Sequence, residues 1–94
     1  MQPIPWSARL RIAPDQLSTE LDEEVVILSF KGGKYFGLSE VGARVWKVLR
    51  DSPLLGEIRD RLVAEYDVDQ KRCEKDLLNL VKDLRTHGIV EIVD

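Results

Sequence analysis

Residues 25–46 read VVILSFKGGKYFGLSEVGARVW, and within them the hydrophobic pattern changes from the period of a strand to that of a helix. Residues 25–30 are β-branched and nearly continuous, which predicts a strand covered on much of both faces, and so the middle strand of a sheet. The glycine pair at 32–33 supplies the positive φ angles of a tight hairpin turn, so residues 34–38 are expected to form the next strand. At Ser39 the apolar spacing becomes helical.

The glycine pair also suggests a register for this hairpin. A loop of those two residues places Phe30 opposite Tyr35. It also places Lys31 opposite Lys34, and because like charges on facing positions repel each other, a slightly longer loop stays open as an alternative.

One more strand is predicted before the hairpin. Apolar and charged residues alternate over residues 9–13 (RLRIA), which is the pattern of a half-buried strand. Residues 15–24 are polar and acidic, and we expect them to be a connection over the surface. The strands at 9–13, 25–30 and 34–38 are therefore expected to form one antiparallel sheet.

Three helices follow at short intervals. Ser39 is the expected N-cap of the first helix, which the sequence DSP at 51–53 ends. Asp67 or Asp69 is expected to cap the third. Each helix has an apolar stripe that is expected to face the core. The stripes are Val41, Val45, Val48 and Leu49, with Trp46 beside them, then Leu55, Ile58, Leu62 and Tyr66, and finally Cys73, Leu77, Leu80, Val81 and Leu84.

The order of these elements predicts an α+β fold. Gly88 ends the third helix, and residues 89–93 either add a short final strand or cover the core. We expect a small winged-helix-like domain, in which a three-stranded antiparallel sheet is followed by a three-helix bundle. At 94 residues, the chain is expected to be one domain over 1–94, with residues 1–8 as an N-terminal extension.

Composition and charge exclude several classes of protein. Hydrophobic residues make up 44% and charged residues 33%, which is ordinary for a globular chain. The net charge of −3 argues against a general affinity for nucleic acid or anionic lipid. One cysteine and one histidine permit no internal disulfide and no histidine-based metal cluster, so we expect no metal or other cofactor and a cytoplasmic location. No apolar run approaches the roughly 18–20 residues that span a bilayer.

Catalysis lacks the necessary residues. Cys73 and His87 lie fourteen residues apart in the third predicted helix, which puts them roughly 20 Å apart along its axis. A nucleophile and its base must be within hydrogen-bond reach of each other. We therefore expect Cys73 to be a core residue and His87 a surface residue, and the chain not to be an enzyme.

DNA binding is an alternative, because three-helix units with a wing are common among DNA-binding domains. The third helix, however, intersperses Asp69, Glu74, Asp76 and Asp83 among its basic residues. The third helix therefore has a net charge of about +1, in a chain whose net charge is −3, and it could neutralise few phosphates of DNA. The charge pattern therefore disfavours this function.

The strand at 34–38 supports peptide binding instead. It is short, follows a tight hairpin and leads directly into a helix, so it is expected to be a sheet edge with unpaired main-chain groups. Such an edge accepts a strand from another chain, and a cleft between the edge and a helix supplies pockets for side chains. An ordinary edge that Lys31 and Lys34 protect stays open as an alternative.

Four stretches carry a resemblance to a known family. They are residues 33–46 (GKYFGLSEVGARVW), 57–58 (EI), 64–69 (AEYDVD) and 84–90 (LRTHGIV). In these stretches the chain resembles the PqqD-like family, the RiPP recognition elements, which bind the leader peptides of ribosomally made natural products. The likeness covers about residues 9–93. Within the family it is most similar to the stand-alone leader-binding subunits of lasso-peptide biosynthesis.

The resemblance implies three strands, three helices and a set of partners. The precursor's leader would pair antiparallel with the third strand and pack on the third helix. A separate leader peptidase and the macrocyclase would receive the bound precursor, and neither nucleic acid nor a membrane would take part. A peptide chaperone of pyrroloquinoline quinone or other RiPP biosynthesis is the alternative, and both a monomer and a weak homodimer stay open.

The resemblance also implies which residues bind the peptide. Carried onto this chain, the strand supplies the main-chain partners, and periodicity assigns the pocket wall and its rim to the third helix. The expected peptide-binding residues are Lys34, Tyr35, Phe36, Gly37 and Leu38 in the strand and Arg72, Cys73, Asp76, Leu77 and Leu80 in the helix.

Overall fold

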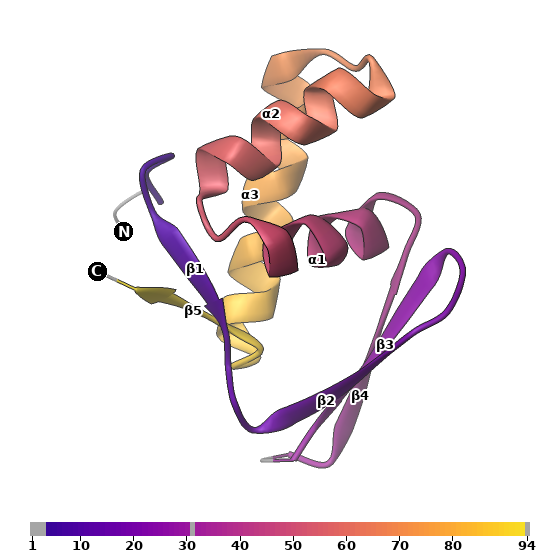
Figure 1. Ribbon diagram of the computed structural model, residues 1–94. Helices are drawn as coiled ribbons and strands as arrows, with labels where there is room; N and C mark the ends of the chain where they lie inside the picture. Colours follow the sequence, from indigo (N-terminus) through magenta and orange to yellow (C-terminus); the bar gives the residue numbers. More distant parts are fainter. Residues whose placement is uncertain (1–3, 31, 94) are drawn as a thin grey trace.

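The computed structural model describes residues 4–30 and 32–93. Four strands precede three helices, and one more strand follows them (Figure 1). The elements are β1 (Arg9–Ile12), β2 (Gln16–Glu20), β3 (Glu24–Ser29), β4 (Lys34–Ser39), α1 (Val41–Asp51), α2 (Leu55–Tyr66), α3 (Gln70–Thr86) and β5 (Val90–Val93).

The strands form two antiparallel sheets, so the prediction of one sheet was wrong. One sheet has the order β2-β3-β4, with β3 in the middle as predicted. The other pairs β1 with β5, so that Leu10 faces Ile92. Residues 9–12 therefore pair with the far end of the chain, a partner that no local pattern indicates.

The segment predicted to be a surface connection contains β2, the third strand of the larger sheet. Its residues are mostly polar because β2 is an edge strand with much of its surface in solvent. Gln16 points inward, and its amide nitrogen donates to the carbonyl of Ile89 at 2.9 Å. Main-chain pairing, as between Thr19 and Val26, holds the strand in place without an apolar face.

In the β3–β4 hairpin, Ser29 at the end of β3 faces Lys34 at the start of β4, so the prediction of a two-residue loop was wrong and the alternative of a longer loop is confirmed. Leu28 faces Tyr35 and Ile27 faces Phe36. Gly33 has φ +61°, the left-handed conformation that the turn requires. The predicted pairing of Lys31 with Lys34 falls on a residue outside those described.

The start of α1 also differs from the prediction. Ser39 pairs with Glu24 as the last residue of β4, and the N-cap position belongs to Glu40, with φ +52° and no side-chain cap. The Glu40 amide donates to the carbonyl of Glu23, so strand pairing continues up to the first residue of the helix boundary. The predicted cap of α3 is confirmed, because the Asp69 carboxylate accepts from the Arg72 amide at 3.2 Å.

The core lies between the larger sheet and the helices. Val25 and Ile27, on the inner face of β3, are fully buried together with Trp46 of α1. In Figure 1, α1 lies over this sheet, α2 lies on the side of α1 away from it, and α3 passes behind α1 and ends next to β5. The α3 helix ends as predicted at Gly88, with φ +74°, and the Ile89 amide bonds back to the carbonyl of Leu84 at 2.8 Å.

The α+β class, with three helices and antiparallel strands, is confirmed. The winged-helix-like label stays a prediction. Of the expected N-terminal extension, residues 4–8 are described, and Ile4 and Ala8 are buried in the core. In the described part of the chain, no helix has the length and apolar character to cross a membrane.

Candidate functional site

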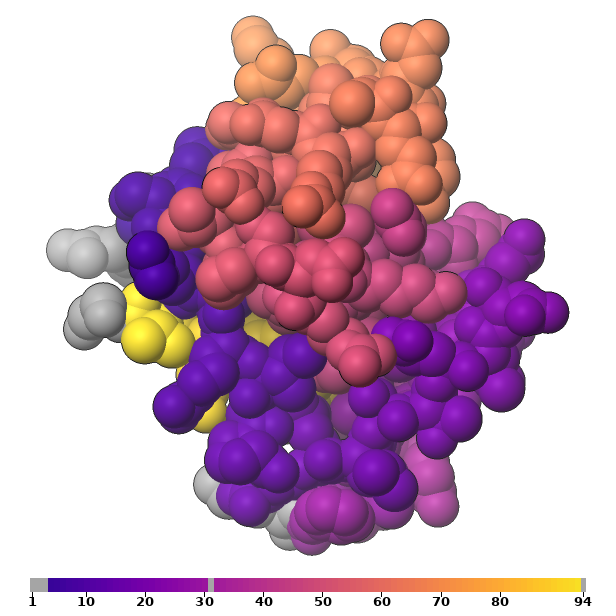
Figure 2. Space-filling model, viewed as in Figure 1, coloured from indigo at the N-terminus to yellow at the C-terminus, as the bar shows by residue number. Residues whose placement is uncertain are grey.

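The three helices surround an apolar pocket of about 340 Å³. Its wall comes from all three helices and from the connection between α2 and α3. In Figure 2, the outline is indented on the right, where the orange atoms of the α2–α3 region meet the magenta atoms that follow β4. The lining residues are Val41, Gly42, Val45, Leu62, Tyr66, Val68, Arg72, Cys73, Asp76, Leu77 and Leu80.

The structure brings all five predicted residues of α3 to this pocket. Cys73 and Leu77 are buried and form the wall, whereas Leu80 is half-buried. Arg72 and Asp76 are exposed, so they supply the polar groups at the rim. The stripe was predicted correctly because one face of a long helix repeats with a regular period in the sequence.

The other six lining residues were missed. Sequence reasoning assigned Val41, Val45, Leu62 and Tyr66 to core stripes, and it assigned no role in the site to Gly42 and Val68. Val41, Tyr66 and Val68 are 45%, 40% and 43% exposed, so apolar surface meets solvent at the mouth. An apolar Val68 between Asp67 and Asp69, in a connection where polar residues are the norm, is the signal that could have indicated this surface.

Strand β4 lies next to the pocket. A Cβ atom on Gly42, which lines the pocket, would lie 3.6 Å from the Leu38 side chain, so strand and pocket wall are in contact. Two residues earlier in the strand, the ring centroids of Phe36 and His87 are 4.6 Å apart. The strand therefore runs from the C-terminal end of α3 toward the pocket.

Side chains alternate along β4, so the five predicted strand residues do not share one face. Lys34, Phe36 and Leu38 lie on the face that meets the helices. Tyr35 and Gly37 lie on the outer face, where Tyr35 is 71% exposed and a Cβ on Gly37 would have no neighbour within 4 Å. Tyr35 and Gly37 can therefore take part in the site only through their main chain or on the outer face.

The main-chain groups alternate as well, and two bonds fix their direction. The Leu21 amide donates to the carbonyl of Glu24, so the main-chain groups of residue 24 point toward β2. The Glu40 amide donates to the carbonyl of Glu23, so the main-chain groups of residue 23 point toward β4. Continuing this alternation, Phe36 and Leu38 bond to β3, while the N–H and C=O groups of Tyr35 and Gly37 point to the opposite edge. No strand in the described part of the chain pairs with that edge.

Cys73 is suited to packing rather than to chemistry. Burial raises the pKa of the Cys73 thiol, and the carboxylates of Asp76 and Glu74 raise it further. The thiol is therefore protonated at neutral pH, and it adds a small apolar surface to the pocket. Within residues 4–30 and 32–93, no three His, Cys, Asp or Glu side chains are grouped so that they could hold a metal ion.

A second, polar cavity of about 240 Å³ adjoins the apolar pocket at Tyr66. The charged residues that line it are Asp22, Glu23, Glu40, Arg44 and Lys47. Two of these charges are engaged inside the chain. Arg44 pairs with Glu65 at 2.8 Å, and the Lys47 ammonium donates to the carbonyl of Asp22 at 3.2 Å.

The model of the family "Coenzyme PQQ synthesis protein D (PqqD)" matches residues 24–90. The chain belongs to the PqqD family. The matched residues run from the start of β3 to the start of β5, so this PqqD-family region contains β4 and the whole apolar pocket. The resemblance to PqqD-like RiPP recognition elements that the sequence predicts is therefore confirmed.

Two solved structures are similar to this PqqD-family chain. "TbiB1 in Complex with the TbiA(beta) Leader Peptide" is 37% identical, with a TM-score of 0.82 over 86% of this chain and 94% of the other. "Lasso peptide synthetase B1 complexed with the leader peptide" is 26% identical, with a TM-score of 0.79 over 89% and 99%. None of the curated proteins compared with the chain matches it.

Proposed function

We propose that this PqqD-family chain binds the leader peptide of a ribosomally made precursor and serves lasso-peptide biosynthesis. The observation that carries the proposal is an apolar pocket beside an unpaired strand edge. Both similar structures named above are complexes with a leader peptide, and both chains are matched over most of their length, which supports the same role here.

In this proposal the leader adds a strand to β4. Its main chain bonds antiparallel to the free N–H and C=O groups of Tyr35 and Gly37, which is tolerant of the leader's sequence. Alternate leader side chains then point toward the helices, and one enters the apolar pocket beside Leu38. Burial of a large apolar side chain contributes about 1.5–3 kcal/mol, so pocket contacts select the leader.

We also propose that the chain is a docking subunit without catalysis of its own. The bound precursor is presented to a separate leader peptidase and then to a macrocyclase, and residues 1–94 act as one binding domain. Strand addition leaves most of the precursor outside the pocket, where a second protein can reach it. The protonated thiol of Cys73 on the pocket wall supports a role in binding rather than in reaction.

A second candidate is a peptide chaperone in pyrroloquinoline quinone biosynthesis. The description of the matching family model favours it. Both candidates use the same edge and pocket, so they differ in the precursor that is bound. The similar structure of a lasso peptide synthetase B1 with its leader peptide favours the first.

Fluorescence anisotropy of a labelled leader peptide tests the proposal. The peptide comes from the precursor gene nearest to the gene for this chain, and a scrambled peptide of the same composition is the control. We expect saturable binding of the native leader, with Kd on the order of micromolar to tens of nanomolar. Equal binding of both peptides, or none to protein that circular dichroism shows to be folded, would overturn the proposal.

A further inference from the structure

The segment of residues 4–8 is packed against the first turn of α2. The Leu55 amide donates to the carbonyl of Ala8 and the Gly56 amide to the carbonyl of Trp6, each at 3.0 Å. The first amides of a helix have no partner inside the helix, so this segment satisfies two of them. A Cβ on Gly56 would lie 3.2 Å from the carbonyl oxygen of Trp6, so glycine permits this close approach.

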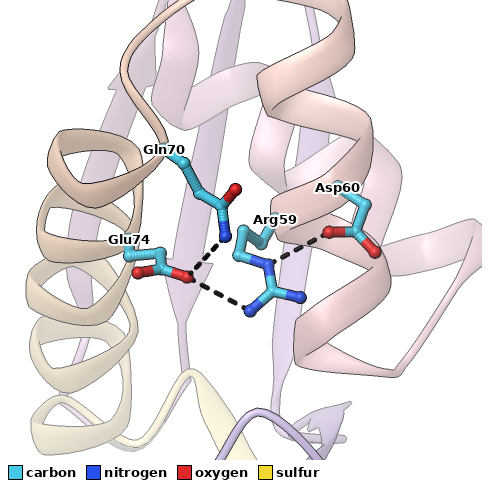
Figure 3. A network of polar contacts seen from close by, with 4 residues as sticks. All are labelled: Arg59, Asp60, Gln70 and Glu74. Carbon is cyan, nitrogen blue, oxygen red and sulfur yellow. Dashed lines mark hydrogen bonds and ion pairs between the residues drawn. The ribbon is translucent and has the colours of Figure 1, made fainter.

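Arg59, one turn further along α2, joins this segment to α3. Its guanidinium carbon lies 4.8 Å from the centroid of the Trp6 ring, which is the arrangement of a cation–π contact. The same guanidinium donates to Asp60 at 3.0 Å and to Glu74 of α3 at 3.2 Å (Figure 3). Gln70 also donates to the Glu74 carboxylate, at 3.3 Å.

Within this network, the Arg59–Glu74 pair is less exposed than the other ion pairs of the described residues. The side chains of Arg59 and Glu74 are 20% and 24% exposed, whereas those of Arg11 and Glu91 are 60% and 43% exposed. Partial burial reduces screening by water, and the forked guanidinium can bond to two carboxylates while it stacks on a ring. The contacts therefore fix one arrangement of Trp6, α2 and α3.

The network lies within one turn of the pocket walls. Arg59 precedes Leu62 by three residues on α2, and Glu74 precedes Leu77 by three on α3, and both leucines line the apolar pocket. Glu74 also follows directly after Cys73 of the same wall. A change in the separation of Arg59 and Glu74 therefore changes the separation of the two walls.

We propose that Arg59 is a positioning residue, which transmits the packing of residues 4–8 to α3 and thereby sets the width of the apolar pocket. The proposal rests on the proposed function, because the pocket is taken to receive a leader side chain. Residues 4–8 lie outside the 24–90 region that the family model matches. In this proposal, a segment outside the matched region therefore supports the pocket inside it.

The test compares Arg59→Met and Glu74→Gln with Arg11→Met, a control that breaks the Arg11–Glu91 pair between β1 and β5. The first readout needs no leader: it is the rate at which iodoacetamide alkylates the thiolate of Cys73, the single cysteine, on the pocket wall. The rate is taken from a series of pH values up to full ionisation of the thiol, because Glu74 raises and Arg59 lowers the pKa of Cys73 and the loss of either charge alone would change the rate at one pH. We expect Arg59→Met and Glu74→Gln to raise this rate about threefold or more, because the walls separate, and Arg11→Met to leave it unchanged. Rates as low as that of the control would overturn the proposal.

The second readout is leader affinity, measured with the native leader and with a leader whose pocket-filling side chain, found by an alanine scan, is cut to alanine. We expect Arg59→Met to lower the affinity for the native leader about five- to tenfold and the affinity for the truncated leader less than about twofold. The truncated leader no longer fills the pocket, so a change in the width of the pocket affects its binding little. Arg59→Lys, which keeps the charge but not the fork, should fall between. Equal losses on both leaders would mean that Arg59 only stabilises the fold, and would overturn the proposal.

Trp6→Leu tests the link to the N-terminal segment, since it keeps an apolar side chain and removes the ring. It should raise the alkylation rate of Cys73, as Arg59→Met does. An unchanged alkylation rate would show that residues 4–8 have no part in setting the width of the pocket. If the unmodified protein binds no leader, the proposed function fails. The alkylation rates then still decide whether Arg59 sets the distance between the walls.

Discussion

The rings of Phe36 and His87 meet edge to face, with their centroids 4.6 Å apart and their planes at 61°. Phe36 is on the inner face of β4 and His87 is at the C-terminal end of α3, so the contact fixes the edge strand along the helix. Gly37, the next residue, has no such neighbour and directs its main chain to the free edge. Two adjacent residues of the candidate site thus have different tasks: one fixes the strand and the other presents its main chain.

Proline substitution separates these two tasks. Gly37→Pro removes an N–H that points to the free edge, and the open space around Gly37 accommodates the ring. We expect leader affinity to fall about tenfold or more, by anisotropy, while the free energy of unfolding falls by about 1 kcal/mol or less. Phe36→Pro removes a bond to β3 and the contact with His87, so it should cost about 3 kcal/mol or more. Unchanged leader affinity in folded Gly37→Pro protein would exclude β4 as the binding edge.

A charged residue at Leu80 tests the pocket wall. Leu80 is half-buried and lines the pocket, whereas Leu77 is 3% exposed and belongs to the core, so Leu80→Asp disturbs folding less than the same change at Leu77. We expect it to weaken leader binding more than about tenfold, because a carboxylate replaces apolar surface that the leader would cover. Leu78→Asp is the matched control, since Leu78 is a half-buried leucine of α3 that does not line the pocket. Equal losses of affinity in the two variants would count against the pocket.

Parts of the fold and the site that repeat with a local period could be predicted from the sequence. The α3 stripe, with Cys73 and Leu77 four residues apart, was correct because residues at this spacing share one face of a helix. The central position of β3 followed from its continuous run of β-branched and apolar residues. These signals depend only on neighbours within one or two turns.

Contacts between distant segments could not be predicted in this way. The pairing of Leu10 with Ile92 joins the two ends of the chain, and β2 was hidden because its pairing is carried by the main chain. Tyr66 and Val68 form the pocket mouth only after α2 and α3 pack together. The stacking of Arg59 on Trp6 likewise joins two segments that share no sequence pattern.

A substitution at the exposed apolar mouth of the pocket should change leader binding with little effect on folding. Val68 is 43% exposed at the mouth, and Val93, in β5 and outside the pocket lining, is 38% exposed. Val68→Ser and Val93→Ser should each change the free energy of unfolding by about 0.5 kcal/mol or less, as surface substitutions usually do. Only Val68→Ser should lower the affinity for the leader, by roughly three- to tenfold, because it removes apolar area from the binding surface. Titrations in which both variants bind as tightly as the unmodified protein would contradict this role for the mouth.

The raised pKa of the Cys73 thiol predicts how stability depends on alkaline pH. The folded state holds the thiol proton more tightly than the unfolded state, because burial and the carboxylates of Asp76 and Glu74 oppose the thiolate. This contribution to stability is fully present below the ordinary pKa of a cysteine, and it is lost as the pH rises through the raised value. The Cys73→Ala variant lacks the group, so between neutral pH and the raised pKa the unmodified protein should lose more stability than the variant does. Urea unfolding at a series of pH values measures this difference, and parallel curves for the two proteins would show that the thiol has the same pKa in the folded and unfolded states.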